Sequence, residues 1–331
     1  ETVSLPGPSL TQGRDGLAGV SGGKSINARG VRKGADIDGK GISSTYGYVA
    51  GGTSPPDRST IDRLDYSTDS ITGPAVHGLE LRSSRRGLSS FGNKNYGYFC
   101  NGFQTFNHID KIDFSNETRS DDLTSTYPAY YAQSFSNSNY GYICGGIRQF
   151  PPSVTTSRSI IERMDFETES LVIINSTLEN VLSSSAAVSN PNYGYFGGGD
   201  TGSVSNTIER FEFSNETSII STGTLSQKRY GLGSFQNSNY GYFFGGSTPT
   251  KSSIIDRLDF STDLTTPPGN MPEEKTRPSG LFNSYHGYAY GGGNPPSWRT
   301  LVHRMDFSDE TISLLTDRMT QERNQSIGLS N

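Results

Sequence analysis

A basic side chain followed two residues later by a carboxylate recurs six times, within segments such as Ile255-Asp256-Arg257-Leu258-Asp259-Phe260. The six pairs are Arg63 and Asp65, Lys111 and Asp113, Arg163 and Asp165, Arg210 and Glu212, Arg257 and Asp259, and Arg304 and Asp306. These groups could form a charged collar around a channel, or each basic group could pair with a carboxylate or carbonyl of its own or the next repeat. A feature carried by every repeat serves what all repeats share, so the sequence favours packing contacts.

The residues that differ between repeats lie in short loops, several of them rich in proline. The candidate binding residues in these loops are Arg58, Phe103, Phe106, Arg148, Phe150, Trp298 and Arg299. Aromatic and arginine side chains contribute much of the binding energy of protein interfaces, and loops on a rigid scaffold commonly carry function. An alternative is that Phe150 and Trp298 fold back and cap the protein.

The sequence contains no pattern that indicates catalysis or metal binding. No two of the four histidines, His77, His108, His286 and His303, have the spacing of metal ligands. Cys100 and Cys144 occupy equivalent places in neighbouring repeats. Matching positions on packed sheets lie roughly 10 Å apart, beyond the Cα separation of about 7 Å that a disulfide allows. We therefore expect two buried thiols, no metal, no cofactor and no enzymatic activity.

The elements that position these residues follow from a recurring motif. It consists of a Tyr-Gly-Tyr tripeptide, two further residues and then a glycine pair. The sixth copy reads His-Gly-Tyr, and Asn replaces the first glycine of the second pair. The central glycines of the six tripeptides are Gly47, Gly97, Gly141, Gly194, Gly241 and Gly287, spaced 44 to 53 residues apart. Repeats of this length are typical of propeller blades and too long for most helical or leucine-rich solenoids.

Each repeat supplies the strands of one blade. The segment that carries the basic residue alternates with period two, which indicates a strand, and polar residues such as Ser115-Asn116-Glu117-Thr118 then predict a tight turn. A third strand follows this turn, and a fourth precedes the next Tyr-Gly-Tyr, over segments such as 86–93 and 229–237.

The two ends of the chain each lack one part of a repeat. Residues 323–331 repeat the Arg-to-Asn spacing of 229–237 with no Tyr-Gly-Tyr after them, whereas Tyr46 has no strand before it. The sequence therefore predicts an all-β fold over residues 44–331. This fold is a six-bladed β-propeller of four-stranded antiparallel blades, closed by the C-terminal strand joining the first blade. Such closure removes exposed sheet edges.

Residues 1–43 differ in composition from the repeats. They are rich in glycine and contain no apolar run of strand length, so we expect an extended arm that binds other proteins of an assembly. The formal net charge of the whole chain is −5, which gives no reason to expect nucleic-acid binding. No apolar run in the sequence approaches the length of a membrane span.

The repeats resemble those of the kelch family, although the tryptophan that kelch repeats carry later in each blade is absent. The pairing of Asn239-Tyr240-Gly241-Tyr242-Phe243-Phe244-Gly245-Gly246 with the following Ile-Asp-Arg-Leu-Asp-Phe-Ser-Thr resembles degenerate kelch-like repeats in structural proteins of tailed phages, notably marine cyanophages. This resemblance covers residues 44–331. It implies a virion location, on the particle surface or in the tail, and no catalytic residue.

We therefore expect a non-enzymatic virion structural and recognition protein, part of a tail fibre or a surface decoration. Its variable loops would bind a host surface glycan or a neighbouring virion protein, and residues 1–43 would bind other virion proteins. The alternative from a different class is a secreted or periplasmic carbohydrate-binding protein, or a propeller enzyme that uses the same face.

Overall fold

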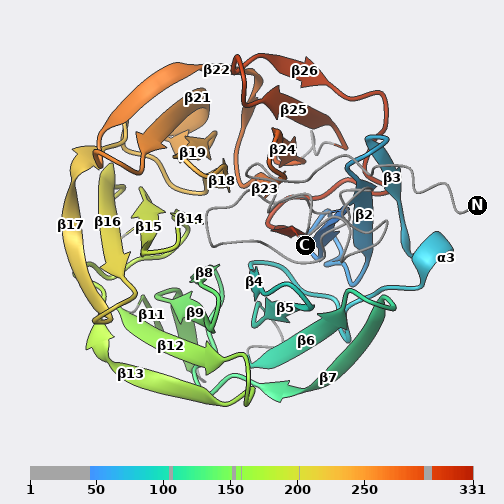
Figure 1. The fold of residues 1–331 in the computed structure, drawn as a ribbon, viewed down its shortest axis with the longest axis horizontal. Coiled ribbons are helices and arrows are strands. Elements are labelled where there is room, and N and C mark those ends of the chain that lie inside the picture. Colours follow the sequence, from blue (N-terminus) through green and yellow to red (C-terminus); the bar gives the residue numbers. More distant parts are fainter. Residues whose placement is uncertain are drawn as a thin grey trace, which may run out of the picture.

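The computed structural model describes residues 45–330 except 104–106, 151–153, 158, 201 and 294–299, and it leaves the side chains of 148–150 and 154–157 undescribed. These residues form six antiparallel sheets arranged in a ring (Figure 1). The fold is the six-bladed β-propeller that the repeats predict. The expected arm, residues 1–43, lies outside the described residues.

Each blade runs from an inner strand beside the central channel to an outer strand at the rim (Figure 1). Blade 1 contains β27 (Ile327–Ser330), β1 (Tyr46–Ala50), β2 (Ile61–Asp65) and β3 (Ser70–Thr72). Blade 2 contains β4 (Ser89–Gly92), β5 (Tyr96–Cys100), β6 (His108–Asp113) and β7 (Thr118–Thr124). Blade 3 contains β8 (Gln133–Ser136), β9 (Tyr140–Cys144), β12 (Ile160–Asp165) and β13 (Leu171–Thr177).

The other three blades follow the same order. Blade 4 contains β14 (Ala186–Ser189), β15 (Tyr193–Gly197), β16 (Thr207–Glu212) and β17 (Thr217–Thr224). Blade 5 contains β18 (Gly233–Gln236), β19 (Tyr240–Phe244), β21 (Thr250–Asp259) and β22 (Thr265–Lys275). Blade 6 contains β23 (Ser279–Phe282), β24 (His286–Tyr290), β25 (Val302–Asp306) and β26 (Ile312–Leu314).

A few short elements lie outside this pattern. They are the hairpin of β10 (Ile147–Phe150) with β11 (Val154–Ser157), the strand β20 (Ser247–Thr248), which pairs with β21, and the four-residue helix α3 (Pro74–His77). Among the described residues, no helix has the length and apolar character needed to span a membrane.

The C-terminal strand closes the ring. β27 pairs with β1 in antiparallel register, from Gly47 opposite Ser330 to Ala50 opposite Ile327. Both ends of the repeat array therefore meet in one blade, as the sequence predicts. The inner strands are shorter than expected, however. For example, β4 covers only Ser89–Gly92 of the predicted segment 86–93. The residues before each inner strand instead form hydrogen bonds around the channel mouth, as shown below.

Hydrophobic side chains fill the space between neighbouring blades. Six buried clusters lie at the six blade interfaces; one of them joins Tyr48 and Ile61 of blade 1 to Phe99 and Phe114 of blade 2. The central glycine of each tripeptide permits this packing. A Cβ atom at Gly141, for example, would overlap the ring of Phe91 from the preceding blade. The recurring tripeptide is thus a scaffold feature.

The two ends of the ring differ. The tight turns between the third and fourth strands of each blade, and between the first and second strands of blades 2 to 6, lie at one end of the ring, which we call the turn end. The opposite loop end carries the loops after the glycine pairs and the connections between blades. The second glycine of each pair, such as Gly52, has a positive φ and donates its N–H to a carbonyl in the following connection, here Arg85. Glycine is suited to this left-handed geometry.

Candidate functional site at the loop end

The six repeated basic residues connect neighbouring blades. Each forms an ion pair with a carboxylate in the turn between the third and fourth strands of the next blade. Arg63, for example, pairs with Glu117 at 2.5 Å. The other pairs are Lys111 with Glu169, Arg163 with Glu216, Arg210 with Asp263, Arg257 with Glu310, and Arg304 with Asp69. The same carboxylates accept hydrogen bonds from Tyr48, Tyr98, Tyr142, Tyr195, Tyr242 and Tyr288.

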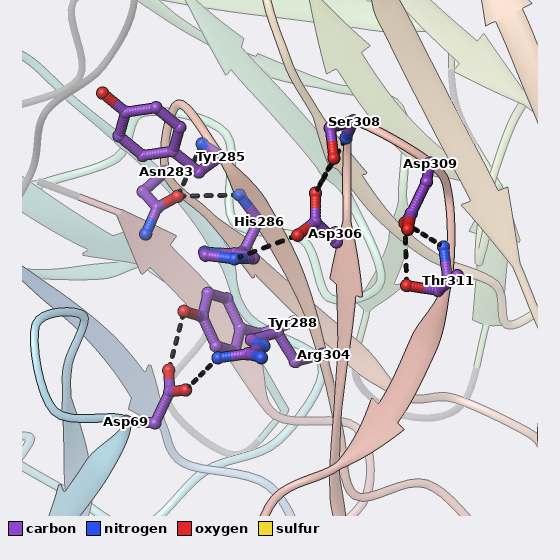
Figure 2. A network of polar contacts seen from close by, with 10 residues as sticks. All are labelled: Asp69, Asn283, Tyr285, His286, Tyr288, Arg304, Asp306, Ser308, Asp309 and Thr311. Carbon is purple, nitrogen blue, oxygen red and sulfur yellow. Dashed lines mark hydrogen bonds and ion pairs between the residues drawn. The ribbon is translucent and has the colours of Figure 1, made fainter.

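Figure 2 shows one of these six contacts, in which Asp69 of blade 1 accepts from Tyr288 and Arg304 of blade 6. We call each set of tyrosine, basic residue and turn carboxylate an interblade latch. In five of the latches the basic group also lies over the ring of the first tyrosine of the tripeptide, for example Arg63 over Tyr46 at 4.4 Å. This geometry favours the packing interpretation of the basic residues.

The carboxylates two residues beyond the basic residues have a different role, which is to order the turns of their own blades. Asp65 accepts from the backbone N–H of Ser67 at 2.8 Å, and Asp306 accepts from Ser308 in the same way (Figure 2). Asp113, Asp165 and Asp259 also accept a turn N–H, and Glu212 accepts from the Ser214 hydroxyl. The sequence reasoning missed the latch carboxylates, which are marked by their constant place in the turn.

Two of the seven candidate binding residues have described side chains. Arg58 is half-buried and donates to the carbonyl of Ser54 at 3.1 Å, so it orders its own loop. Phe103 is half-buried, with the Arg86 guanidinium 4.2 Å above its ring. Phe106, Trp298 and Arg299 lie outside the described residues; Arg148 and Phe150 are in β10, whose side chains after Ile147 are not described.

Phe103 belongs to an aromatic and arginine cluster at the loop end. Its ring lies 5.4 Å from that of Tyr130 in an edge-on arrangement, and Tyr130 lies 5.0 Å from Tyr131. Asp57 accepts two hydrogen bonds from Arg86, at 2.8 and 2.9 Å, and so holds the guanidinium against Phe103. We call Asp57, Arg86, Phe103, Tyr130 and Tyr131 the aromatic cluster. Arg86, Tyr130 and Tyr131 fall in segments that the sequence predicts as strands, which is why they were missed as site residues.

A closed belt of backbone hydrogen bonds surrounds the channel mouth at the loop end. One residue from the connection before each inner strand contributes to this belt: Gly87, Tyr131, Ser184, Gly231, Arg277 and Gln325. Each donates its N–H to the carbonyl of the preceding member, over 2.6 to 3.2 Å, and Gly87 completes the circle by donating to Gln325. All six residues have φ between 51° and 64°, in the left-handed region.

The channel inside the belt holds a cavity of about 190 Å³. Small residues from the six inner strands form its middle layer: Ser90, Ser134, Ala187, Ser234, Gly280 and Gly328. The serine hydroxyls donate to neighbouring carbonyls, as Ser90 does to Gly328 at 2.8 Å. Arg277 is the only charged residue among the described residues that line the cavity.

The thiols and histidines lie apart from this site. Cys100 and Cys144 are free and buried, and burial raises the pKa of both thiols well above the usual range. Burial lowers the pKa of His303 to about 4. Within the described part of the chain, no group of three or more His, Cys, Asp or Glu side chains could hold a metal ion.

The comparisons with known proteins support the fold and go no further. No protein-family model matches the chain, and no curated protein matches it significantly. Among solved structures, the one described as "Structure of YjhT" aligns with a TM-score of 0.65 and 12% sequence identity. The alignment covers 74% of this chain and 87% of that chain. At this identity the likeness shows a shared fold alone.

Proposed function

We propose that this protein is a non-enzymatic recognition module displayed on a phage particle, in a tail fibre or as a surface decoration. Its loop end binds a glycan of the host surface, and residues 1–43 attach it to neighbouring virion proteins. The observation that carries the proposal is the difference between the two ends of the ring. The turn end uses its repeated charged residues in interblade latches, whereas the loop end holds an aromatic cluster that the described loops of the other blades do not repeat.

The aromatic cluster has the composition of a carbohydrate-binding surface. Aromatic rings offer large apolar faces at low cost in side-chain entropy, and tyrosine adds a hydroxyl for hydrogen bonding. Phe103 and Tyr130 are half-buried at the loop end. Because Asp57 fixes Arg86 against Phe103, the cluster is ordered before a ligand binds, which reduces the entropy lost on binding.

The residues that could act as nucleophiles or proton carriers support a non-enzymatic role. The two thiols are buried and protonated, and thiols in that form are poor nucleophiles. Burial, together with the adjacent carboxylate, raises the pKa of each of the six latch tyrosines. Their hydroxyls therefore remain neutral hydrogen-bond donors inside the blade interfaces.

The test of recognition compares two aromatic residues at opposite ends of the ring. Phe103→Ala removes the ring that Arg86 covers, and Tyr285→Ala removes a tyrosine that is 70% exposed in a turn at the other end. On a panel of immobilised bacterial surface glycans, the full chain should retain a subset of the glycans. Phe103→Ala should weaken that binding at least fivefold, the loss of about 1 kcal/mol, and Tyr285→Ala should leave it unchanged. Equal effects of the two substitutions would contradict a binding site at the loop end.

The proposed location needs a separate measurement. Antibodies against the propeller should label purified phage particles in electron micrographs, and protease should cut residues 1–43 more slowly in the particle than in the isolated chain. A protein found only free in the medium, with its glycan binding intact, would contradict the particle role and favour a secreted carbohydrate-binding protein.

A further inference from the structure

The channel mouth carries side chains where the backbone favours glycine. Two blades place Gly87 and Gly231 at the left-handed belt positions, whereas the others place Tyr131, Ser184, Arg277 and Gln325 there at φ of 51° to 55°. A side chain in this conformation costs free energy that glycine avoids. The belt hydrogen bonds use only backbone atoms, so they do not explain these four side chains. Strained residues of this kind cluster at ligand sites.

Arg277 is the member of this set whose side chain is available to bind a charged ligand. Its guanidinium forms no hydrogen bond or ion pair with the described residues, and its Nε atom is buried without a partner. The other arginines with described side chains all have such a contact. The Arg277 guanidinium lies 5.9 Å from the ring centre of Tyr131 and 5.7 Å from that of Tyr230.

The remaining polar groups at the mouth are also hydrogen-bond donors. The Tyr131 hydroxyl donates to Oε1 of Gln325, an arrangement that leaves the Nε2 amide group of Gln325 as a donor. Tyr131 and Arg277 come from blades 3 and 6, on opposite sides of the ring, and both line the cavity together with Gln325. A guanidinium and an amide N–H₂ on one small opening form a site for an anion, and arginine binds carboxylates in a two-pronged geometry.

The cavity has the size and lining for a small organic anion. No carboxylate is among the described residues that line it, although the chain as a whole has a formal net charge of −5. Its volume of about 190 Å³ leaves room for more than a single water molecule. The serine hydroxyls below the belt donate to neighbouring carbonyls, but each hydroxyl oxygen can also accept a hydrogen bond, as from a sugar hydroxyl.

We infer that Arg277, with Gln325, Tyr131 and Tyr230, binds the carboxylate of an acidic saccharide, a uronic acid, at the mouth of the central channel. This inference rests on the proposed function, because it names the chemistry of the glycan that the loop end recognises. The aromatic cluster would then hold adjoining sugar rings, since Tyr131 belongs both to it and to the channel mouth.

The experiment measures binding of D-glucuronate, D-glucose and acetate to the full chain by titration calorimetry or ligand-observed NMR. Glucuronate should bind more tightly than either glucose or acetate. Arg277→Gln should weaken glucuronate binding at least tenfold. The matched control Lys228→Gln removes the same charge from an exposed side chain at the loop end and should leave binding unchanged. Glucuronate binding that survives Arg277→Gln, or glucose binding of equal strength, would overturn the carboxylate site. Acetate binding as tight as that of glucuronate would contradict recognition of a saccharide, because the carboxylate alone would then account for binding.

A second variant separates loss of binding from loss of folding. Arg277→Gly keeps the left-handed backbone and reproduces the residue of blades 2 and 5, so it should unfold at the same temperature as the parent or higher while losing glucuronate binding. Normal glucuronate binding to this variant would again overturn the inference. Failure of the proposed function has a different result, in which no surface glycan is retained on the panel although free glucuronate binds through Arg277. Neutral glycans retained independently of Arg277 would instead uphold recognition and refute the carboxylate site.

Discussion

At the scale of single residues, the latch carboxylates carry a structural cost that their contacts offset. Asp69, Glu117, Glu169, Glu216, Asp263 and Glu310 all have φ between 54° and 59°. A residue other than glycine in this region costs about 1–2 kcal/mol. Each of these side chains accepts from a tyrosine hydroxyl and a basic group of the preceding blade, and hydrogen bonds that involve a charged group are the stronger kind.

Arg210→Ala should lower the stability of the propeller. It leaves Asp263 without its cation and removes the guanidinium from the ring of Tyr193, 4.5 Å away. Because both partners are about one-fifth exposed, we expect a loss of about 1–2 kcal/mol rather than the larger cost of a fully buried pair. Thermal unfolding followed by circular dichroism measures the effect. Arg318→Ala is the control, since Arg318 is exposed and donates a hydrogen bond to the carbonyl of Leu315 in its own loop. Unchanged stability with lost glycan binding would contradict the structural role.

At the scale of elements, each blade–blade joint combines a latch at the turn end with a contact at the loop end. Three blades bury an arginine beside a carboxylate of the third strand, in the pairs Arg85 with Asp110, Arg229 with Asp256 and Arg323 with Asp62. Blades 3 and 4 lack the arginine, and there hydroxyl and backbone groups satisfy Glu162 and Glu209. Burial raises the pKa of Glu209 as a result. The turn end is therefore regular and the loop end varies.

The latches make the joints sensitive to alkali. The latch tyrosines have a folded-state pKa raised above the usual value of about 10, chiefly by burial and then by the carboxylate. Below about pH 10 both folded and unfolded chains keep the proton, so stability is unaffected. Above about pH 10 only the unfolded chain releases it, and the free energy of unfolding should fall by about 1.4 kcal/mol per pH unit for each tyrosine.

Denaturant unfolding across this pH range measures that slope, and tyrosinate absorbance reports when the phenols ionise. The latch tyrosines should ionise together with unfolding. A free energy of unfolding that stays constant well above about pH 10 would show that the latch tyrosines do not retain their protons.

The sequence predicts the strands and the closure but only part of the site. Period-two alternation and constant spacing are local signals, so the blades follow from the sequence directly. The partner of Arg63 is Glu117 on the next blade, and that pairing depends on how the sheets pack. The belt was hidden because Tyr131 and Arg277 lie in segments that look like the start of a strand. Alignment of these segments would place Arg277 at the same position as Gly87, Tyr131, Ser184, Gly231 and Gln325, and would mark it as the one charged residue of that set.

At the scale of the whole molecule, the ring joins the two ends of the repeat array through one strand. The inner strands β27, β4, β8, β14, β18 and β23 contact one another in sequence around the channel. β27 therefore has three neighbours, which are β1 in its own blade and the inner strands of blades 2 and 6. β27 and β1 come from opposite ends of the repeat array, so backbone pairing between these two strands, and not a turn, closes the circle.

Substitution in this strand should consequently affect the whole ring. Leu329 is 5% exposed and packs in the core between blades 1 and 2, where its side chain lies against Gly97. Leu329→Ala should reduce the free energy of unfolding by about 2–4 kcal/mol, because a buried leucine loses apolar contacts and leaves a cavity. Leu314→Ala makes the same chemical change on β26, where the side chain is 48% exposed, and should cost less than about 1 kcal/mol.

The shape of the denaturation curve separates closure from ordinary core packing. If β27 closes a cooperative ring, Leu329→Ala should shift the whole transition to lower denaturant, with tyrosine fluorescence from every blade and circular dichroism changing together. Loosening of blade 1 alone would instead give two transitions, the first with a small amplitude. Equal effects of Leu329→Ala and Leu314→Ala would contradict the closure, because the first residue seals the ring and the second lies at its rim.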